Sequence, residues 1–348
     1  RDWAWITQVE SQQRLNEYQK WMPHVHVDFH EQGINEPYYF APAAEPYHEV
    51  ITKWQRDFQF MIGKNNAKYF DENGWLYFTK EIFDLLYPSY GDTYPTYLGA
   101  IGMTYEQAGG GVAGLGILNS EGKNLTLVDR VMHHTVAGIS TVEISSANSE
   151  KLNTEFINFF KNKAGNTTYI MNGDKDKIDQ LSRFLKKHKI DFYSSDNQKL
   201  SVYSYNKNKT INYSISTADL IIPNYQPKGK LVDVFLERTT KLSDSVTYDI
   251  TAWSLPFVYG VNGYSTSKKI ELKKYKEKKV ENLVDKKAIA YAGIWNHIND
   301  AKFLSNLIEN EIKVRYTEKI IKNGSLTLPH GSLIIYKGDQ TNINYEKI

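Results

Sequence analysis

The sequence predicts an α/β fold arranged as two domains, on three observations. Its 348 residues exceed the length of one average domain. Helix-like and strand-like segments alternate along the chain, which favours layers of helices packed on sheets. The sequence pattern also changes near residue 165. We therefore expect one domain over residues 1–164 and a second over residues 165–348.

Apolar residues at helical spacing predict the first element, a helix over residues 6–21 that ends before Pro23. A strand follows at once, and it leads into a loop rich in proline and aromatic residues. The same criteria predict four more helices and one more strand in this domain. The helices are expected near residues 47–65, 79–86, 125–138 and 149–163, and the strand at residues 101–107.

In the second domain, patterns of strand, helix and strand recur, and the last of them begins near residue 288. No internal repeat of fixed period is evident. The lysine-rich stretch 268–287 is typical of a solvated edge or a linker.

Composition excludes several classes of function. The formal net charge of +2 gives no overall field that would demand nucleic acid or an anionic membrane as a partner. No run approaches the 18 apolar residues of a membrane span. The absence of cysteine excludes disulfides, thiolate zinc sites and cysteine nucleophiles, so any metal must be held by His, Asp and Glu.

The chain opens with RDWAWITQVE, which has neither a methionine nor the pattern of a signal peptide. We expect a mature or cleaved product of a longer chain, with a missing N-terminal segment. A tyrosine-rich, cysteine-free composition fits an extracytoplasmic hydrolase, periplasmic or secreted, and equally a cytoplasmic protein.

The stretch HVHVDFH places four polar side chains at alternate positions of a strand, and these are His24, His26, Asp28 and His30. Alternate side chains share one face but lie about 7 Å apart, so at most one or two of them can bind the same metal ion. A polar face satisfied by hydrogen bonds is the alternative.

Glu106 lies on the apolar strand IGMTYEQ, just before a glycine run. A lone glutamate on a strand is usually solvated or ion-paired. Beside a metal it could instead take a proton from a bound water and return it to a leaving amine.

Three stretches in this order, RDW at residues 1–3, VDFHEQG with His30 and GMTYEQAGG with Glu106, resemble the C-terminal half of the zinc carboxypeptidase domain. The resemblance implies a mixed-sheet domain and a Zn²⁺-dependent peptidase that hydrolyses a peptide bond with a metal-activated water. His30 would be a metal ligand and Glu106 the catalytic base and acid.

The same resemblance implies that Arg1 grips the terminal carboxylate of a peptide substrate. Tyr87 or Tyr90 would be the tyrosine that caps bound substrate, and spacing does not decide between them. Asp92 also falls where the family has an aspartate.

The chain departs from the family pattern because no H-x-x-E motif, which supplies two zinc ligands, occurs in its 348 residues. The remaining ligands are therefore expected upstream, and this chain alone is expected to be inactive. The alternative is a metal-free binding module that recognises peptides or cell-wall fragments in a cleft lined by Tyr38, Tyr39 and Phe40.

Residues 165–348 resemble the C-terminal extension of larger bacterial carboxypeptidase-like proteins, an α/β domain similar to glutamine amidotransferases. Without a cysteine nucleophile, this domain is expected to be structural or substrate-selecting.

Two further motifs are weaker. GGGVAG at residues 109–114 formally fits a dinucleotide-binding pattern, but no helix pattern follows it. His133 and His134 are adjacent on a helix and cannot chelate one ion together, so we expect one buried and one exposed imidazole.

Overall fold

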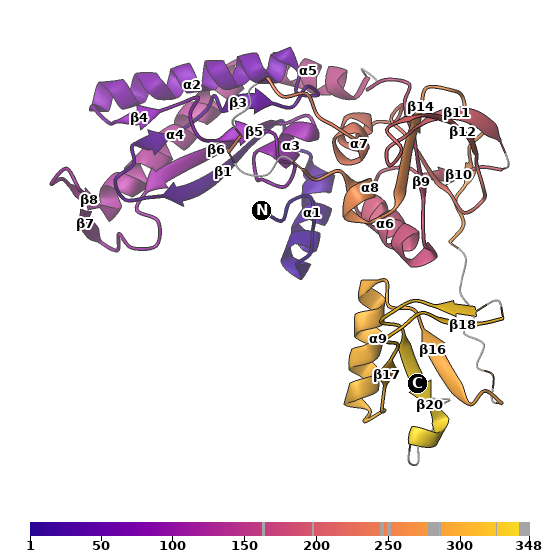
Figure 1. The fold of residues 1–348 in the computed structure, drawn as a ribbon. Coiled ribbons are helices and arrows are strands. Elements are labelled where there is room, and N and C mark those ends of the chain that lie inside the picture. Colours follow the sequence, from indigo (N-terminus) through magenta and orange to yellow (C-terminus); the bar gives the residue numbers. More distant parts are fainter. Residues whose placement is uncertain are drawn as a thin grey trace. The chain divides into compact units, whose positions relative to one another are not determined.

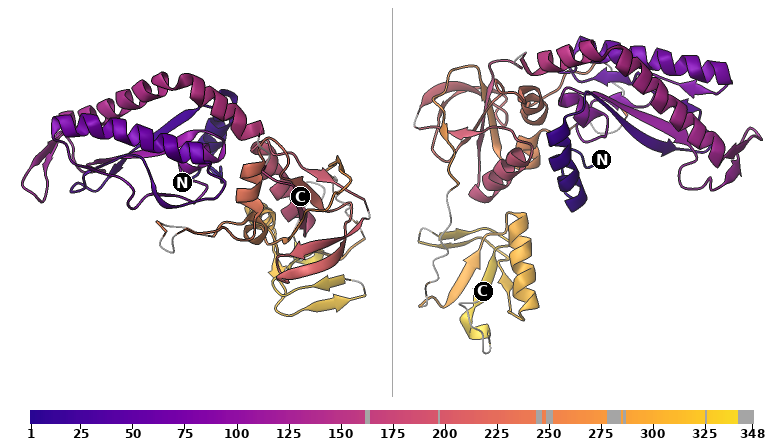
Figure 2. Two further views of the ribbon diagram at one scale, coloured as in Figure 1. Left: turned by 90° about the horizontal axis from the view of Figure 1, so that it is seen from above. Right: turned by 180° about the vertical axis from the view of Figure 1, so that it is seen from behind.

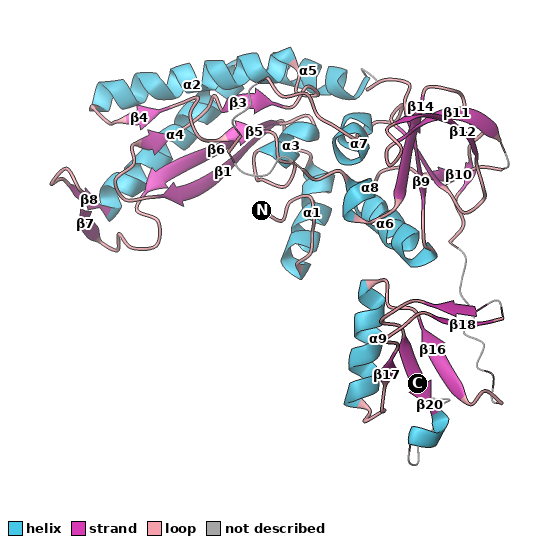
Figure 3. Ribbon diagram, viewed as in Figure 1, coloured by secondary structure: helices cyan, strands magenta, loops and turns pink. Residues whose placement is uncertain are grey.

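The chain forms two compact units, Arg1–Tyr275 and Lys276–Ile348. The computed structural model (Figure 1) describes residues 1–161, 164–196, 198–243, 247–248, 252–277, 285, 287–324 and 326–340. Both units contain helices and strands, so the α/β class predicted from the sequence is confirmed (Figure 3).

The first sheet of unit 1 has four strands in the order β1-β6-β2-β4. These are β1 (Val25–Gln32), β6 (Ile101–Ala108), β2 (Tyr38–Tyr39) and β4 (Tyr77–Phe78). Strand β1 runs parallel to β6, and β2 runs antiparallel to it. The expectation that the strands carrying His30 and Glu106 are neighbours in a mixed sheet is therefore confirmed.

Helices α2 (Lys53–Asn73) and α4 (Leu127–Ala147) pack against each other and against β6 (Figure 2). Both begin with capping boxes, at Thr52 and Thr126. Their apolar side chains meet the odd-numbered residues of β6 in one core. The even-numbered residues of β6, including Glu106, therefore face the opposite side of the sheet.

Most helices predicted in this half are present with shifted bounds. The remaining helices are α1 (Val9–Trp21), the short α3 (Thr93–Tyr97) and α5 (Ser149–Lys161). The glycine run after β6 leads into a hairpin of β7 (Gly116–Leu118) and β8 (Asn124–Thr126), not into a phosphate-binding helix.

The helix predicted near residues 79–86 is wrong. Lys80 and Ile82 have φ angles of 59° and 65°, which a right-handed helix does not allow. The segment instead supplies β5 (Asp84–Leu85), which pairs in parallel with β3 (Ala44–Tyr47). Pairing with a distant strand has overridden the local helical pattern.

The second sheet of unit 1 has seven strands in the order β12-β11-β14-β9-β13-β10-β15, and every pair is antiparallel. Its strands are β9 (Thr168–Asn172), β10 (Tyr193–Ser194), β11 (Lys199–Ser204), β12 (Lys209–Ser214), β13 (Leu220–Pro223), β14 (Asn262–Thr266) and β15 (Lys273–Lys274). Its helices are α6 (Lys175–Lys187), α7 (Gly229–Leu236) and α8 (Leu255–Val258).

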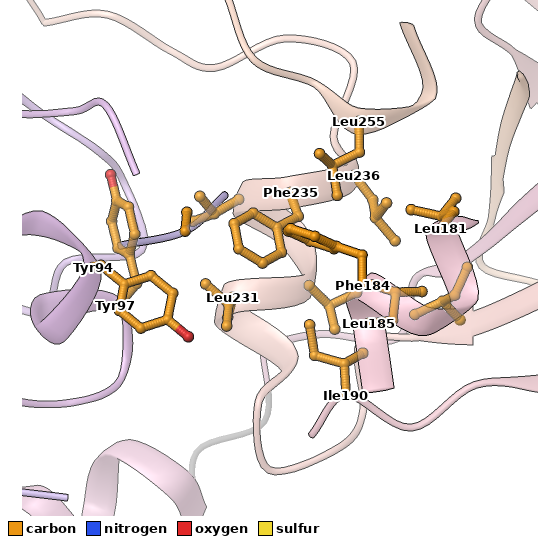
Figure 4. Close-up of a cluster of buried hydrophobic side chains, with 14 of the residues drawn as sticks. Tyr94, Tyr97, Leu181, Phe184, Leu185, Ile190, Leu231, Phe235, Leu236 and Leu255 are labelled. Atoms are coloured by element: carbon orange, nitrogen blue, oxygen red, sulfur yellow. The ribbon is translucent and has the colours of Figure 1, made fainter. Parts of the chain in front are cut away.

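The boundary expected between residues 164 and 165 separates the two sheets but not two compact units. One hydrophobic core runs from Tyr94 and Tyr97 of α3 to Phe184 of α6 and Phe235 of α7 (Figure 4). His188 adds hydrogen bonds across the same junction, since its ring nitrogens lie 2.7 Å from the Tyr94 hydroxyl and 2.8 Å from the Ala4 carbonyl. The compact units divide after Tyr275.

Unit 2 confirms the α/β unit expected near the end of the chain. It contains β16 (Ala290–Gly293), α9 (Ile298–Glu309), β17 (Arg315–Tyr316), β18 (Ile321–Asn323), β19 (Leu326–Leu328), β20 (Leu333–Tyr336) and a short 3₁₀ helix (Lys337–Asp339). Residues 278–284 and 286 of the lysine-rich stretch lie outside the described residues.

Unit 2 repeats the architecture of residues 168–223. Each contains, in order, a strand, a helix, a short strand, a hairpin and a final strand. The sheet orders also correspond, because β13 lies between β9 and β10 as β20 lies between β16 and β17, with all pairs antiparallel.

The two copies end their helices in the same way. Lys189 and Glu311 follow α6 and α9 with φ angles of 53° and 57°. The next residue donates its N–H to the helix in both cases, Ile190 to Leu185 at 3.0 Å and Ile312 to Leu307 at 2.9 Å. A repeat therefore exists, although its hairpins differ in length and hide it from a search for a fixed period.

Replacing Phe235 with alanine tests the shared core of unit 1. Phe235 is fully buried between Trp5 and Phe184, so its loss is expected to cost about 3–5 kcal/mol of unfolding free energy. Urea denaturation measures this cost, and hydrogen exchange reports each sheet. Phe257→Ala, at a position 51% exposed, is the control. Unchanged exchange protection in the first sheet would show that the two sheets are independent domains after all.

Candidate active site

Parallel pairing of β1 with β6 brings His30 and Glu106 together. The two residues are register partners, and partners in neighbouring strands point to the same face. Nδ1 of His30 lies 3.7 Å from Oε1 of Glu106. Asp28 and Thr104 form the next pair on this face.

These side chains line a cavity of about 290 Å³. One wall of the cavity is the β1–β6 face. The N-terminal residue, the loop after β5 and one residue that follows α7 also line it. Its lining comprises Arg1, Asp28, His30, Glu31, Gln32, Phe83, Asp84, Tyr90, Gly91, Asp92, Thr104, Glu106 and Tyr248. The sequence thus brings a cation, an imidazole and several carboxyl groups to one hollow.

Glu106 is a buried acid of the cavity with a raised pKa. Its side chain is 8% exposed, and its Oε2 has no hydrogen-bond partner among the described residues. The pKa of Glu106 is raised to about 7, mainly by burial; His30 opposes this rise, and the carboxylates of Asp28 and Asp92 add to it. A carboxyl group with a pKa near neutrality can both accept and release a proton.

Asp92 supports the floor of the cavity. It is buried, and its carboxylate accepts hydrogen bonds from the hydroxyls of Thr93 and Thr104, each at 2.9 Å. Burial raises the pKa of Asp92, although these hydrogen bonds oppose the rise. Gly91 beside it has no side chain because a Cβ there would lie 1.8 Å from Oδ2 of Asp28.

Arg1 is held at the cavity by the backbone around it. Its carbonyl accepts a hydrogen bond from the buried Ser89 hydroxyl at 2.8 Å, and the same hydroxyl accepts the N–H of Ala4 at 3.0 Å. The Arg1 guanidinium lies 5.4 Å from the ring centre of Tyr90. Cation–π contact of this kind orients a guanidinium.

The two candidate capping tyrosines have different surroundings. Tyr90 lines the cavity beside Arg1. Tyr87 is 8% exposed, packs with Leu86 and Trp253, and accepts a hydrogen bond from the Trp5 indole. The geometry therefore favours Tyr90 for contact with a ligand.

The other histidines of the first strand do not join the cavity. The ring of His26 packs edge-on against Trp3 at 5.1 Å and Tyr18 at 5.7 Å, and burial lowers its pKa. His24 lies 4.1 Å from the ring of Phe156. Only Asp28 and His30 of the four reach the cavity, in line with the limit set by strand geometry.

The expectation of one buried and one exposed imidazole on α4 is wrong. His133 and His134 are both half-buried, and each has its own partner. Nδ1 of His133 lies 2.8 Å from the Gln107 amide oxygen, and Nδ1 of His134 lies 2.7 Å from the Tyr38 hydroxyl. The two rings serve the packing of α4 on the sheet.

Sequence reasoning missed Asp84, Thr104 and Tyr248. Asp84 accepts the backbone N–H of Tyr248 at 2.8 Å, which brings the aromatic ring to the cavity. Tyr248 lies far along the chain with no motif around it, and Asp84 lies where a helix was expected. Thr104 could have been found, because it faces the same side as Glu106 two residues later.

The described residues do not provide a complete zinc site. No three His, Asp or Glu side chains among them are arranged to hold a metal ion. A catalytic zinc takes three protein ligands, and His30 with the buried Glu106 falls short of that number. His30 could supply one ligand of a site that other residues complete.

Comparison with protein-family models, with curated proteins and with solved structures found no match for this chain. None of the described helices is long and apolar enough to cross a membrane. The site must therefore be interpreted from its own geometry.

Replacement of Glu106 by glutamine tests its raised pKa. An acid whose pKa rises from 4.5 to about 7 on folding holds its proton more tightly in the folded state. The free energy of unfolding should therefore fall as pH rises from about 4.5 to about 7, by up to about 3 kcal/mol. The neutral amide of Glu106→Gln should remove this fall.

Urea denaturation of both proteins at several pH values measures the effect, and the exposed Glu36→Gln serves as the control. Parallel stability curves for wild type and Glu106→Gln across this range would mean that Glu106 ionises normally.

Proposed function

We propose that the chain contributes to a zinc-dependent peptidase of carboxypeptidase type. The observation that carries the proposal is the approach of His30 to a buried Glu106 in a cavity that also holds Arg1. This arrangement supplies an imidazole suited to a metal, a carboxyl group suited to proton transfer and a cation suited to a substrate carboxylate.

In this proposal, four residues of the cavity have separate roles. Glu106 accepts a proton from the water that attacks the peptide carbonyl and passes it to the leaving amine. Arg1 binds the terminal carboxylate of the peptide, and Tyr90 covers the bound substrate. His30 would be one zinc ligand, and the remaining ligands would have to come from outside the described residues.

The finer fold assignment belongs to the same proposal. The mixed β1–β6 sheet with helices on one face would be part of a carboxypeptidase-like domain, and the sheet after residue 168 an amidotransferase-like accessory layer. The core shared by the two sheets supports a structural role for that layer. An extracytoplasmic location, periplasmic or secreted, would suit such a peptidase.

Glu106→Gln is the direct test of the proposed chemistry. Hydrolysis of peptides with a free C-terminal carboxylate is measured on the complete natural protein supplied with zinc. Loss of a general base should lower kcat by about 10²–10⁴-fold, while the exposed Glu36→Gln should leave it unchanged. Full activity in Glu106→Gln would rule out this role.

A metal-free binding module for peptides or cell-wall fragments is the second candidate. It is favoured by the lack of a three-ligand group among the described residues. Calorimetric titration with a peptide and with its C-terminal amide, with and without a chelator, separates the two functions. A binding module should bind the free carboxylate equally well with chelator present and release no product, whereas chelator-sensitive cleavage would exclude it.

A further inference from the structure

The two copies of the internal repeat differ in how the edge of their sheets is paired. In the first copy, β9 pairs with β13 on one side and accepts β14 on the other, antiparallel from Asn172 to Thr168. The corresponding strand of the second copy, β16, pairs with β20 alone among the described residues. Among the described residues, the edge that β14 closes in the first copy therefore has no strand partner in the second.

The β16 edge also lacks the charged residues that three other edge strands of the described sheets carry. The edge strands β12, β15 and β17 contain Lys209, Lys273 with Lys274, and Arg315. Charged residues on an edge discourage pairing with another strand. Residues 289–295, IAYAGIW, contain neither a charge nor a proline. This stretch therefore carries neither of these obstacles to pairing with another strand.

The open hydrogen-bonding groups of β16 can be identified. Lys337 donates its N–H to the carbonyl of Ile289 at 3.0 Å, so the backbone of Ile289 faces β20. Because backbone groups alternate in direction along a strand, those of Ala290, Ala292 and Ile294 point away from β20. An incoming antiparallel strand would bond to these three residues.

The sequence of this edge is complementary to itself. An antiparallel pair of two β16 strands centred on Ala292 sets Ala290 opposite Ile294 of the other copy, and Ile289 opposite its Trp295. Ile289, Ile294 and Trp295 are 79%, 49% and 45% exposed, so pairing would cover apolar surface that is now open to water. Opposed side chains at this spacing contribute to strand association.

We propose that two copies of this chain associate through β16, joining their three-stranded sheets into one continuous six-stranded sheet about a two-fold axis. The antiparallel sense is the one that β14 adopts on β9. The inference is independent of the cavity around Glu106.

Sedimentation velocity over about two decades of protein concentration tests the association. The wild-type chain is expected to change from monomer to dimer. Ala292→Pro removes an outward N–H without removing a β16–β20 hydrogen bond, so it should weaken the dimer at least about tenfold. Ala292→Val keeps the N–H and should still dimerise. A wild-type chain that stays monomeric overturns the proposal.

A charge pair tests the register and does not depend on the proline variant folding. Ile289→Lys, at a highly exposed position, should weaken the dimer, and so should Trp295→Glu. A mixture of the two variants should recover dimer, because the lysine of Ile289→Lys would face the glutamate of Trp295→Glu in the other copy. Mixing Ile289→Lys with Ile294→Glu should not. The β16 interface would be contradicted if none of these changes weakened the dimer. Recovery of dimer on mixing Ile289→Lys with Ile294→Glu would contradict it as well.

Discussion

The parallel hydrogen-bonded register between β1 and β6 is the constraint on which the rest of the site depends. It sets His30 beside Glu106 and Asp28 beside Thr104. A shift of one residue would turn the side chains of one strand to the opposite face, toward α2 and α4. The apolar residues of β6 that pack under these helices therefore fix the polar residues that face the cavity.

Burial of Glu106 gives that geometry a chemical consequence. The carboxyl group stands on a strand with neighbours on both sides, and Tyr39 of β2 is its backbone partner opposite β1. Removing it from water favours the protonated form, and Asp28 and Asp92 act in the same direction. The cavity thus holds an acid that can exchange its proton near neutral pH, next to an imidazole and within reach of Arg1.

Patterns within short segments predicted much of this structure. The alternation around His30, the apolar strand of Glu106 and most helices were evident from residue spacing, because each depends on neighbours in sequence. Tyr248 and Asp84 reach the cavity through long-range contacts that leave no local signal. The core shared by Phe235 and Tyr94, which lie on opposite sides of residue 165, likewise leaves no local signal in the sequence. The repeat was hidden because it conserves strand order and a helix cap while its side chains and hairpin lengths differ.

Crosslinking of residues 30 and 106 tests the central claim most directly. The chain contains no cysteine, so His30→Cys with Glu106→Cys introduces the only two thiols. A short bifunctional thiol reagent should join them within one chain, as detected by mass spectrometry of the digested protein. Val27→Cys with Glu106→Cys, on opposite faces of the sheet, should not react in this way. Equal yields from the two pairs, or no crosslink between positions 30 and 106, would contradict the shared cavity.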